Sequence, residues 1–169
     1  LSITIPQGAA GARLNASTTT EGDKETATLP SIEVEATSPL GIIRLDIFQG
    51  TKVSGPGNWN GSIKLPKLLD NSSVNVSDGT VSAVIELGFP EGQLDFDKPV
   101  RLLIPGQAGK SIGYTRAGAP VTEITKTLSS DSRMAASAEL SSGEAGKIDV
   151  GDDLVIWTTH FTKFVAYTP

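Results

Sequence analysis

Short apolar runs rich in β-branched residues recur along the chain, and polar residues interrupt several of them at every second position. Between residues 43 and 47, isoleucine or leucine at the odd positions alternates with Arg44 and Asp46. A period of two places the apolar side chains on one face of an extended strand. The pattern predicts strands at Ile3–Ile5, Ile32–Glu35, Ile42–Phe48, Val81–Leu87, Val100–Ile104, Ile112–Thr115, Leu154–Thr159 and Phe161–Tyr167.

Turn-forming residues separate these runs. Glycine, proline, serine and asparagine cluster at Ser38–Gly41, Gly55–Asn58, Ser77–Gly79 and Pro105–Gln107. Short strands at this spacing predict an all-β protein with the architecture of an antiparallel β-sandwich. The sequence contains neither an internal repeat nor an internal linker, so residues 1–169 are predicted to form a single β-sandwich domain.

Two segments depart from the strand pattern. The segment Ser130–Leu140 contains Met134 beside two alanines but lacks a clean apolar stripe, so both a short helix and a loop or hairpin fit it. The segment Ala9–Leu29 is polar and rich in threonine and glycine. We interpret it as a long loop or a weakly ordered edge.

The composition narrows the classes of partner. The chain is 38% hydrophobic and 20% charged, which argues against intrinsic disorder. The net charge is −5 and the densest positive charge is only Lys64 and Lys67, so nucleic acid is not an expected partner. No apolar run approaches the roughly 20 residues of a membrane-spanning helix, so no membrane insertion is expected. A start at Leu1 rather than at methionine is compatible with earlier removal of a leader.

The sequence context of the asparagines indicates the cellular compartment in which the protein works. Four of the five asparagines, Asn15, Asn60, Asn71 and Asn75, open an Asn-x-Ser/Thr sequon, whereas chance predicts roughly one in a chain this rich in Ser and Thr. The sequons predict a secreted or cell-surface glycoprotein, or an unglycosylated prokaryotic surface relative of one. The alternative is a Ser/Thr-rich surface in which the motif arises by chance.

Metal and cofactor chemistry have little support. The chain has no cysteine and one histidine, His160, so a metal site would need carboxylate or carbonyl oxygens. Asp149, Asp152 and Asp153 cluster around Gly151, but they lack the acidic spacing of a calcium-binding loop. We interpret them as a solvated turn before a strand, and we predict no metal and no cofactor.

Enzyme motifs are also weak. Glu91, Asp95 and Asp97 could supply the two carboxylates of a glycoside hydrolase, but nothing in the sequence places two of them across a cleft. The segment Gly106–Ser111 resembles a phosphate loop only superficially, because the first glycine is missing at the required spacing. No Gly-x-Ser-x-Gly elbow is present. We therefore expect a protein that is not an enzyme acting on small molecules.

Trp59 offers one binding hypothesis. It lies between Asn58 and Asn60 in a glycine-flanked segment, where an exposed indole ring would stack on a sugar. The alternative is that Trp59 plugs the end of the sandwich. Trp157 lies in an apolar run and is predicted to be a core residue.

Three segments, Val84–Pro90, Leu94–Pro105 and His160–Phe164, together resemble the zona-occludens/uncoordinated domain. This is the β-sandwich of ankyrins, netrin receptors and death-domain scaffold proteins, and the chain resembles a microbial or fungal surface-protein variant of it. The resemblance covers Val81–Tyr167, about half of the chain, while the first half matches only loosely, through Ile5–Ala9. It implies a scaffold or interaction domain.

The resemblance also implies a self-processing site. Some members of that family cut their own backbone between Phe and Ser of a His-Phe-Ser motif, and here His160, Phe161 and Thr162 stand at those positions. In one extended strand His160 and Thr162 would share a face, with Phe161 and Trp157 on the other, so His160 could act as the base. The alternative is an ordinary terminal strand with Phe161 packed and His160 exposed.

The leading hypothesis from the sequence is a non-catalytic extracellular module with a structural, adhesive or protein-interaction role and a protein or glycan partner. One alternative is a carbohydrate-binding module that uses Trp59. The other is a self-cleaving domain that is cut between Phe161 and Thr162.

Overall fold

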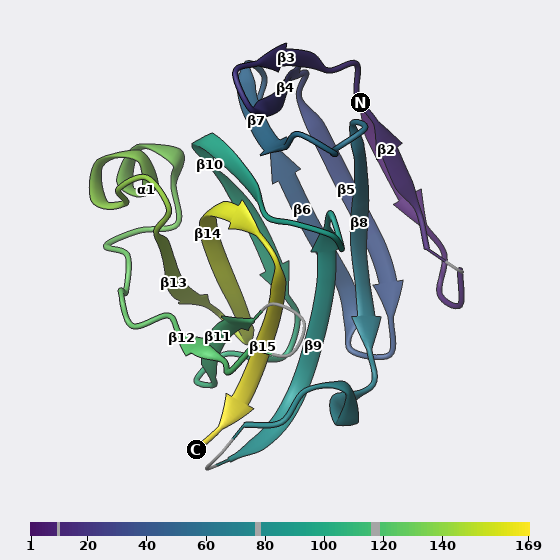
Figure 1. Cartoon of the computed structure of the whole chain (residues 1–169). Coiled ribbons are helices and arrows are strands. Elements are labelled where there is room, and N and C mark those ends of the chain that lie inside the picture. Colours follow the sequence, from purple (N-terminus) through teal and green to yellow (C-terminus); the bar gives the residue numbers. More distant parts are fainter. Residues whose placement is uncertain (10, 77–78, 116–118) are drawn as a thin grey trace.

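The computed structural model describes residues 1–9, 11–76, 79–115 and 119–169. It is 58% strand and 6% helix, and its strands form two facing sheets without a closed barrel (Figure 1). The predicted all-β sandwich is therefore confirmed. Ser77 and Asp78 of the predicted turn Ser77–Gly79 lie outside the described residues. Within the described ranges, no helix has the length and hydropathy needed to cross a bilayer.

The larger sheet has nine strands and is organised around β10 (Leu94–Ile104). One edge of β10 pairs with β14 (Asp153–Phe161), which also carries β13 (Ala145–Val150). The other edge pairs with two strands in succession, β7 (Thr51–Pro56) and β6 (Gly41–Ile47). From β6 the sheet continues through β5 (Ile32–Ser38) to β1 (Ser2–Ile5) at one end. From β7 it continues through β4 (Lys24–Leu29) to β3 (Thr19–Glu21) at the other.

The smaller sheet has six strands and is antiparallel in every ladder of the described residues. Its two central strands are β15 (Lys163–Thr168) and β9 (Thr80–Gly88). A 3-10 turn, η1 (Asn71–Ser73), precedes β9. The other strands, from one edge to the other, are β12 (Thr122–Glu123), β11 (Ser111–Thr115), β8 (Ser62–Leu69) and β2 (Arg13–Asn15), with β15 and β9 between β11 and β8.

The main core fills the space between the sheets. Its side chains follow the predicted period of two: Ile43, Leu45 and Ile47 of β6 are buried, whereas Arg44 between them is exposed. Each large aliphatic side chain buried in this way stabilises the fold by about 1.5–3 kcal/mol. The smaller sheet contributes Ile63, Ile85 and Phe164 to the same core. The alternation of side chains therefore decides which face of each strand is buried.

A second, smaller hydrophobic cluster lies on the outer face of the larger sheet. Helix α1 (Arg133–Glu139) packs there, with Ala136 buried against Val155 and Trp157 of β14. The Ser132 Oγ caps the helix by accepting a hydrogen bond from the Ala135 backbone N–H. The structure thus resolves the two alternatives for Ser130–Leu140 in favour of a helix over part of the segment, and it confirms Trp157 as a buried residue.

The interpretation of Ala9–Leu29 as a loop is wrong for much of its length. The segment contains β2, β3 and β4, although β2 and β3 do lie at sheet edges. All three residues of β3 are exposed, so no apolar alternation marks that strand, and only pairing with β4 defines it. The sequence also missed β7 and β8, because Gly55, Pro56 and Pro66 within them resemble turn signals.

Candidate functional site

The chain passes from one sheet to the other at Thr162. Strand β14 ends at Phe161, which pairs with Leu94 of the larger sheet. Strand β15 begins at Lys163, which pairs with Glu86 in the smaller sheet. Thr162 is the single residue between the two strands and forms a bend. Because both of its neighbours are held in ladders of different sheets, the peptide bonds on either side of Thr162 have fixed positions.

Close packing fixes Phe161 at the end of β14. Its ring lies edge-on to Phe96, with 4.5 Å between ring centroids. Gly88 packs against it so closely that an added Cβ would lie 2.7 Å from the Phe161 Cβ. Gly88 also has a φ of +102°, a conformation that favours glycine. A larger residue at position 88 would therefore displace the residue that precedes the bend.

His160 is buried, which contradicts the alternative in which it is exposed. Its side chain is 2% exposed and its ring lies edge-on to Tyr114, at 4.6 Å, and parallel to Phe164, at 6.0 Å. The Thr158 hydroxyl donates to the His160 carbonyl oxygen at 2.9 Å. The imidazole therefore packs among aromatic rings between the sheets.

The predicted geometry of the His160–Phe161–Thr162 segment is wrong in one respect. The segment is not one extended strand, so the rule that residues i and i+2 share a face does not extend across the bend to Thr162. The Thr162 Oγ1 is buried and makes no hydrogen bond within the described residues, to the imidazole or to any other group. Phe161 and Trp157 also separate: Phe161 belongs to the main core and Trp157 to the cluster under α1.

Thr162 lines a cavity of about 290 Å³ at the outer face of the smaller sheet. Glu86 lies in the lining and forms ion pairs with Lys64, at 3.0 Å, and with Lys163, at 3.9 Å. The turn that follows β9 contributes Phe89 to the apolar part of the wall. The cavity thus combines charged, hydroxyl and apolar groups, the mixture typical of a ligand site.

A smaller cavity of about 110 Å³ adjoins it and shares Lys64 and Glu86. Arg13 and Lys67 also line it, and both side chains are exposed. Neither forms an ion pair with a carboxylate in the described part of the chain. The sequence shows Lys64 and Lys67 only as its densest positive charge, too sparse for nucleic acid, and does not indicate a site there. It also gives no sign of Arg13, because only strand pairing brings β2 beside β8.

Trp59 does not offer its ring to a ligand. It is 2% exposed, and its Nε1 donates to the Ser62 carbonyl oxygen at 2.8 Å. The ring packs so tightly on Gly55 that a Cβ there would lie 2.8 Å from it. The hypothesis of an exposed, sugar-stacking Trp59 is therefore corrected, and the alternative of a packed indole describes its position.

The four sequon asparagines are all exposed. Asn15 ends β2, and Asn60 precedes β8 and accepts a hydrogen bond from the Ser62 backbone N–H at 3.1 Å. Asn71 lies in η1 after β8, and Asn75 lies between η1 and β9. Because β8 runs between Asn60 and Asn71, the sequons lie toward both ends of this strand.

The aspartates around Gly151 lie at a turn between two strands: only Asp152 is in the turn itself, whereas Asp149 belongs to β13 and Asp153 begins β14. Asp149 accepts a hydrogen bond from the Gly109 N–H at 3.1 Å, and Asp153 accepts one from the Gly106 N–H at 3.0 Å. The segment that resembles a phosphate loop thus binds carboxylates of the chain itself. Within the described residues, no three acidic or histidine side chains gather as a metal site would require.

The three carboxylates considered for glycoside hydrolysis have separate surroundings. Asp97 accepts a hydrogen bond from the Lys52 backbone N–H at 2.7 Å, and Asp95 accepts one from the Gln93 side chain at 2.6 Å. Glu91 lines the larger cavity. Asp97 therefore helps to hold β7 against β10, whereas the Asp95 contact is local to the start of β10.

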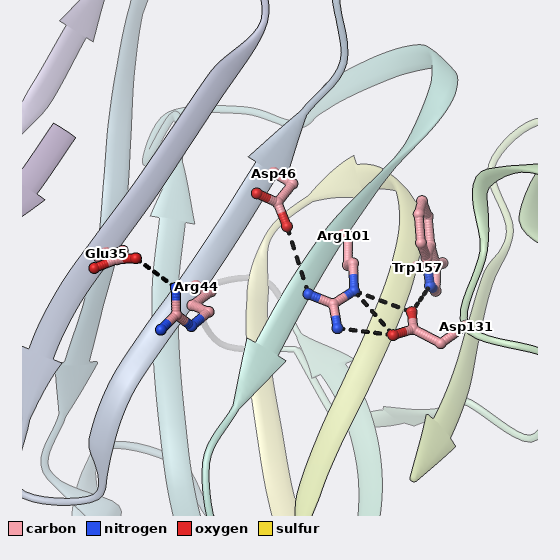
Figure 2. A network of polar contacts seen from close by, with 6 residues as sticks. All are labelled: Glu35, Arg44, Asp46, Arg101, Asp131 and Trp157. Atoms are coloured by element: carbon pink, nitrogen blue, oxygen red, sulfur yellow. Dashed lines mark hydrogen bonds and ion pairs between the residues drawn. The ribbon is translucent and has the colours of Figure 1, made fainter. Parts of the chain in front are cut away.

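A polar network lies on the outer face of the larger sheet (Figure 2). Arg101 forms a two-pronged ion pair with Asp131, with Nη2–Oδ2 at 2.8 Å, and reaches Asp46 at 3.5 Å. The Trp157 Nε1 donates to the Asp131 Oδ1 at 2.8 Å. This network fastens the segment that carries α1 to the sheet.

The fold shifts the pKa values of the two aspartates of this network in opposite directions. Burial is the largest influence on the pKa of Asp46 and, together with the charge of Glu33, raises it despite the nearby Arg101 and Arg44. Burial also acts to raise the pKa of Asp131, but the hydrogen bonds from Arg101 and Trp157 together with the positive charge of Arg101 outweigh it, so this pKa lies below its ordinary value. Arg101, Asp46 and Asp131 therefore interact with one another and with Trp157 on this face.

No family model, curated protein or solved structure matches the chain in comparisons with known proteins, so the resemblance to the zona-occludens/uncoordinated domain stays a prediction from the sequence.

Proposed function

We propose that this chain is a non-catalytic extracellular module that binds a protein or glycan partner through the outer face of its six-stranded sheet. The observation that carries the proposal is the pair of adjoining cavities around the Lys64–Glu86 ion pair. The corresponding face of the nine-stranded sheet is partly covered by α1. Binding residues placed on a rigid sheet need little ordering when a partner docks, which favours affinity.

The extracellular location is supported by the exposure of all four sequon asparagines. In a eukaryotic secretory host, we expect at least two of Asn15, Asn60, Asn71 and Asn75 to carry glycans. Intact mass before and after treatment with a glycosidase measures this occupancy. An unchanged mass of the secreted protein would remove the argument for the compartment.

Binding is tested with fluorescently labelled full-length chain on intact cells and on immobilised extracellular matrix. The variant Lys67→Glu reverses an exposed charge that lines the smaller cavity and forms no ion pair within the described residues. We expect it to lose at least about tenfold in binding, because a partner attracted to this cation is repelled by a carboxylate in its place. Lys98→Glu, exposed on β10 of the other sheet, is the matched control. Equal binding by both variants would contradict the proposed surface.

A second candidate function is self-cleavage between Phe161 and Thr162. The buried Thr162 hydroxyl without a hydrogen-bond partner in the described residues favours it, because such a group costs about 1–3 kcal/mol unless something compensates. The Thr162 Oγ would attack the Phe161 carbonyl carbon, and the C–N bond would break as nitrogen takes up the hydroxyl proton. Water would then hydrolyse the ester, which yields a Phe161 carboxylate and a free Thr162 amine and hydroxyl.

Cleavage would separate the eight-residue peptide Thr162–Pro169. Because β15 pairs with both β9 and β11, we expect the peptide to stay bound under native conditions and to separate on denaturation. Mass spectrometry in denaturant measures it, with Thr162→Ala as the inactive control. His160→Ala tests the imidazole, whose ring packs on Tyr114 and must move to act as a base. A full-length mass after prolonged incubation would leave Thr162 with a structural role.

A further inference from the structure

We propose that the two adjoining cavities on the six-stranded sheet bind an acidic saccharide, that is, a ligand with sugar hydroxyls and a carboxylate or sulfate group. The inference rests on the proposed function and names the ligand class. It concerns a face that the sequence did not identify as a binding site. The saccharide site is therefore placed there and not at Trp59, whose ring is buried. The hydroxylated ring occupies the larger cavity, and the anionic group lies toward Arg13 and Lys67 in the smaller one.

A bulge in β8 builds the cationic end of the site. Lys64 pairs with Gly88 and Lys67 with Glu86, so three steps along β8 match only two along β9. In a regular strand, side chains three residues apart point to opposite faces. The extra residue brings both lysines to the same cavity, while Leu65 between them remains in the core.

Strand pairing adds two more cations to this face. Arg13 of β2 pairs with Lys64, and Lys163 of β15 pairs with Glu86. Together with Lys64 and Lys67 they make four cations, against the carboxylates of Glu86 and Glu91. The chain as a whole carries a net charge of −5, so the positive charge around the two cavities is opposite in sign to the net charge of the protein. Such an excess favours an anionic ligand.

The larger cavity distinguishes a saccharide from an acidic peptide. Glu91 lines the larger cavity but not the smaller one, and its carboxylate oxygens accept hydrogen bonds from sugar hydroxyls but repel the side chains of an acidic peptide. Glu86, which lines both cavities, forms ion pairs with Lys64 and Lys163. Phe89 and Pro90 supply an apolar wall against which the C–H face of a sugar ring packs. Carboxylate acceptors and an apolar wall in the larger cavity, next to Arg13 and Lys67, which form no ion pair in the part of the chain that the structure describes, match a ligand that is both hydroxylated and anionic.

Asn15 constrains how the site is tested. It lies two residues from Arg13 on β2, so both side chains point to the same face of the strand. A glycan on Asn15 would stand beside the cationic end of the site. The binding measurements therefore use full-length protein made in a bacterial host, without N-glycans.

Isothermal titration calorimetry at low and physiological salt tests the proposal with defined probes. The acidic probes are a tetrasaccharide of alternating glucuronic acid and N-acetylglucosamine and its sulfated counterpart. The neutral probe is a tetrasaccharide of N-acetylglucosamine, and the peptide probe is hexaglutamate. We expect one or both acidic saccharides to bind, with affinity that falls as salt rises, and to bind at least about tenfold more tightly than the neutral sugar.

The double variant Arg13→Ala/Lys67→Ala removes the two cations that have no carboxylate partner among the described residues, and we expect it to weaken that binding at least about tenfold. Lys24→Ala/Lys98→Ala changes the net charge equally on the other sheet and should leave it unchanged. Equal weakening by both variants, equal binding of the neutral sugar, or tighter binding of hexaglutamate would each overturn the proposal. Cell-surface binding without acidic-saccharide binding would overturn this inference and leave the proposed function standing.

Discussion

The outer faces of the two sheets both carry charged residues, but these residues have different partners on the two faces. On the nine-stranded sheet, Arg101 is held between Asp131 and Asp46, and α1 covers Trp157 beside it (Figures 1 and 2). On the six-stranded sheet, Arg13 and Lys67 reach solvent beside two cavities. Charges that are paired within the fold stabilise it, whereas charges without a partner are available to bind something else. The comparison predicts that substitutions on the first face change stability and those on the second change binding.

Trp157→Ala should have the largest effect. It removes the indole from the cluster under α1 and the hydrogen bond to Asp131. We expect a loss of about 3–5 kcal/mol in the free energy of unfolding, as for other buried aromatic side chains replaced by alanine. Urea denaturation followed by far-ultraviolet circular dichroism measures it. A loss below about 1 kcal/mol would show that the covered face contributes little to the fold.

Arg101→Ala should have an intermediate effect. The guanidinium and the Asp131 carboxylate are each about four-fifths buried, at 18% and 20% side-chain exposure, so removal of Arg101 leaves two carboxylates without their cation. We expect a loss of about 1–3 kcal/mol. The control is Arg44→Ala, whose ion pair with Glu35 is nearly half exposed and should contribute at most about 0.5 kcal/mol. Equal losses in the two variants would break the distinction between paired interior and exposed charges.

The pH dependence of stability sharpens the same comparison. The pKa of Asp131 is lowered in the fold, so its contribution is present above the ordinary aspartate value of about 3.9 and is lost as pH falls through the lower folded pKa. The pKa of Asp46 is raised, so its contribution is present below about 3.9 and is lost as pH rises through the higher folded pKa.

The two contributions oppose each other in acid and can be separated by substitution. Asp131→Asn should make the unfolding free energy fall less steeply on acidification, whereas Asp46→Asn should make it fall more steeply. Denaturation midpoints between pH 3 and pH 6, a range chosen about the ordinary aspartate pKa, measure both slopes. Parallel curves for the two variants would contradict the assigned directions.

Lys67→Ala should have the smallest effect on stability. The side chain is exposed and has no carboxylate partner in the described ranges, so we expect a change within about 0.5 kcal/mol. The same denaturation assay measures it beside Trp157→Ala. A larger loss would mean that Lys67 stabilises the bulge in β8, and that residues on the outer face of the six-stranded sheet also contribute to stability.

Several features of the fold could be predicted from local pattern. The alternation between residues 43 and 47 correctly predicts the buried face of β6, and the apolar run around Trp157 correctly predicts a buried strand. Exposed edge strands such as β3 could not be predicted, because side chains that are solvated on both faces leave no period to detect. Trp59 resembles a loop residue by its neighbours, yet close packing on Gly55 buries it.

The sequence by itself determined the fold class, the single histidine, the four sequons and the buried face of those strands whose side chains alternate, such as residues 43–47. Only the tertiary structure decided which strands are neighbours. It brought Arg13 and Lys163, separated by most of the chain, to one face, and it set Thr162 at the crossing between sheets. The physical reason is that a strand's period states which side chains share a face, whereas pairing between distant strands depends on how all the faces pack at once.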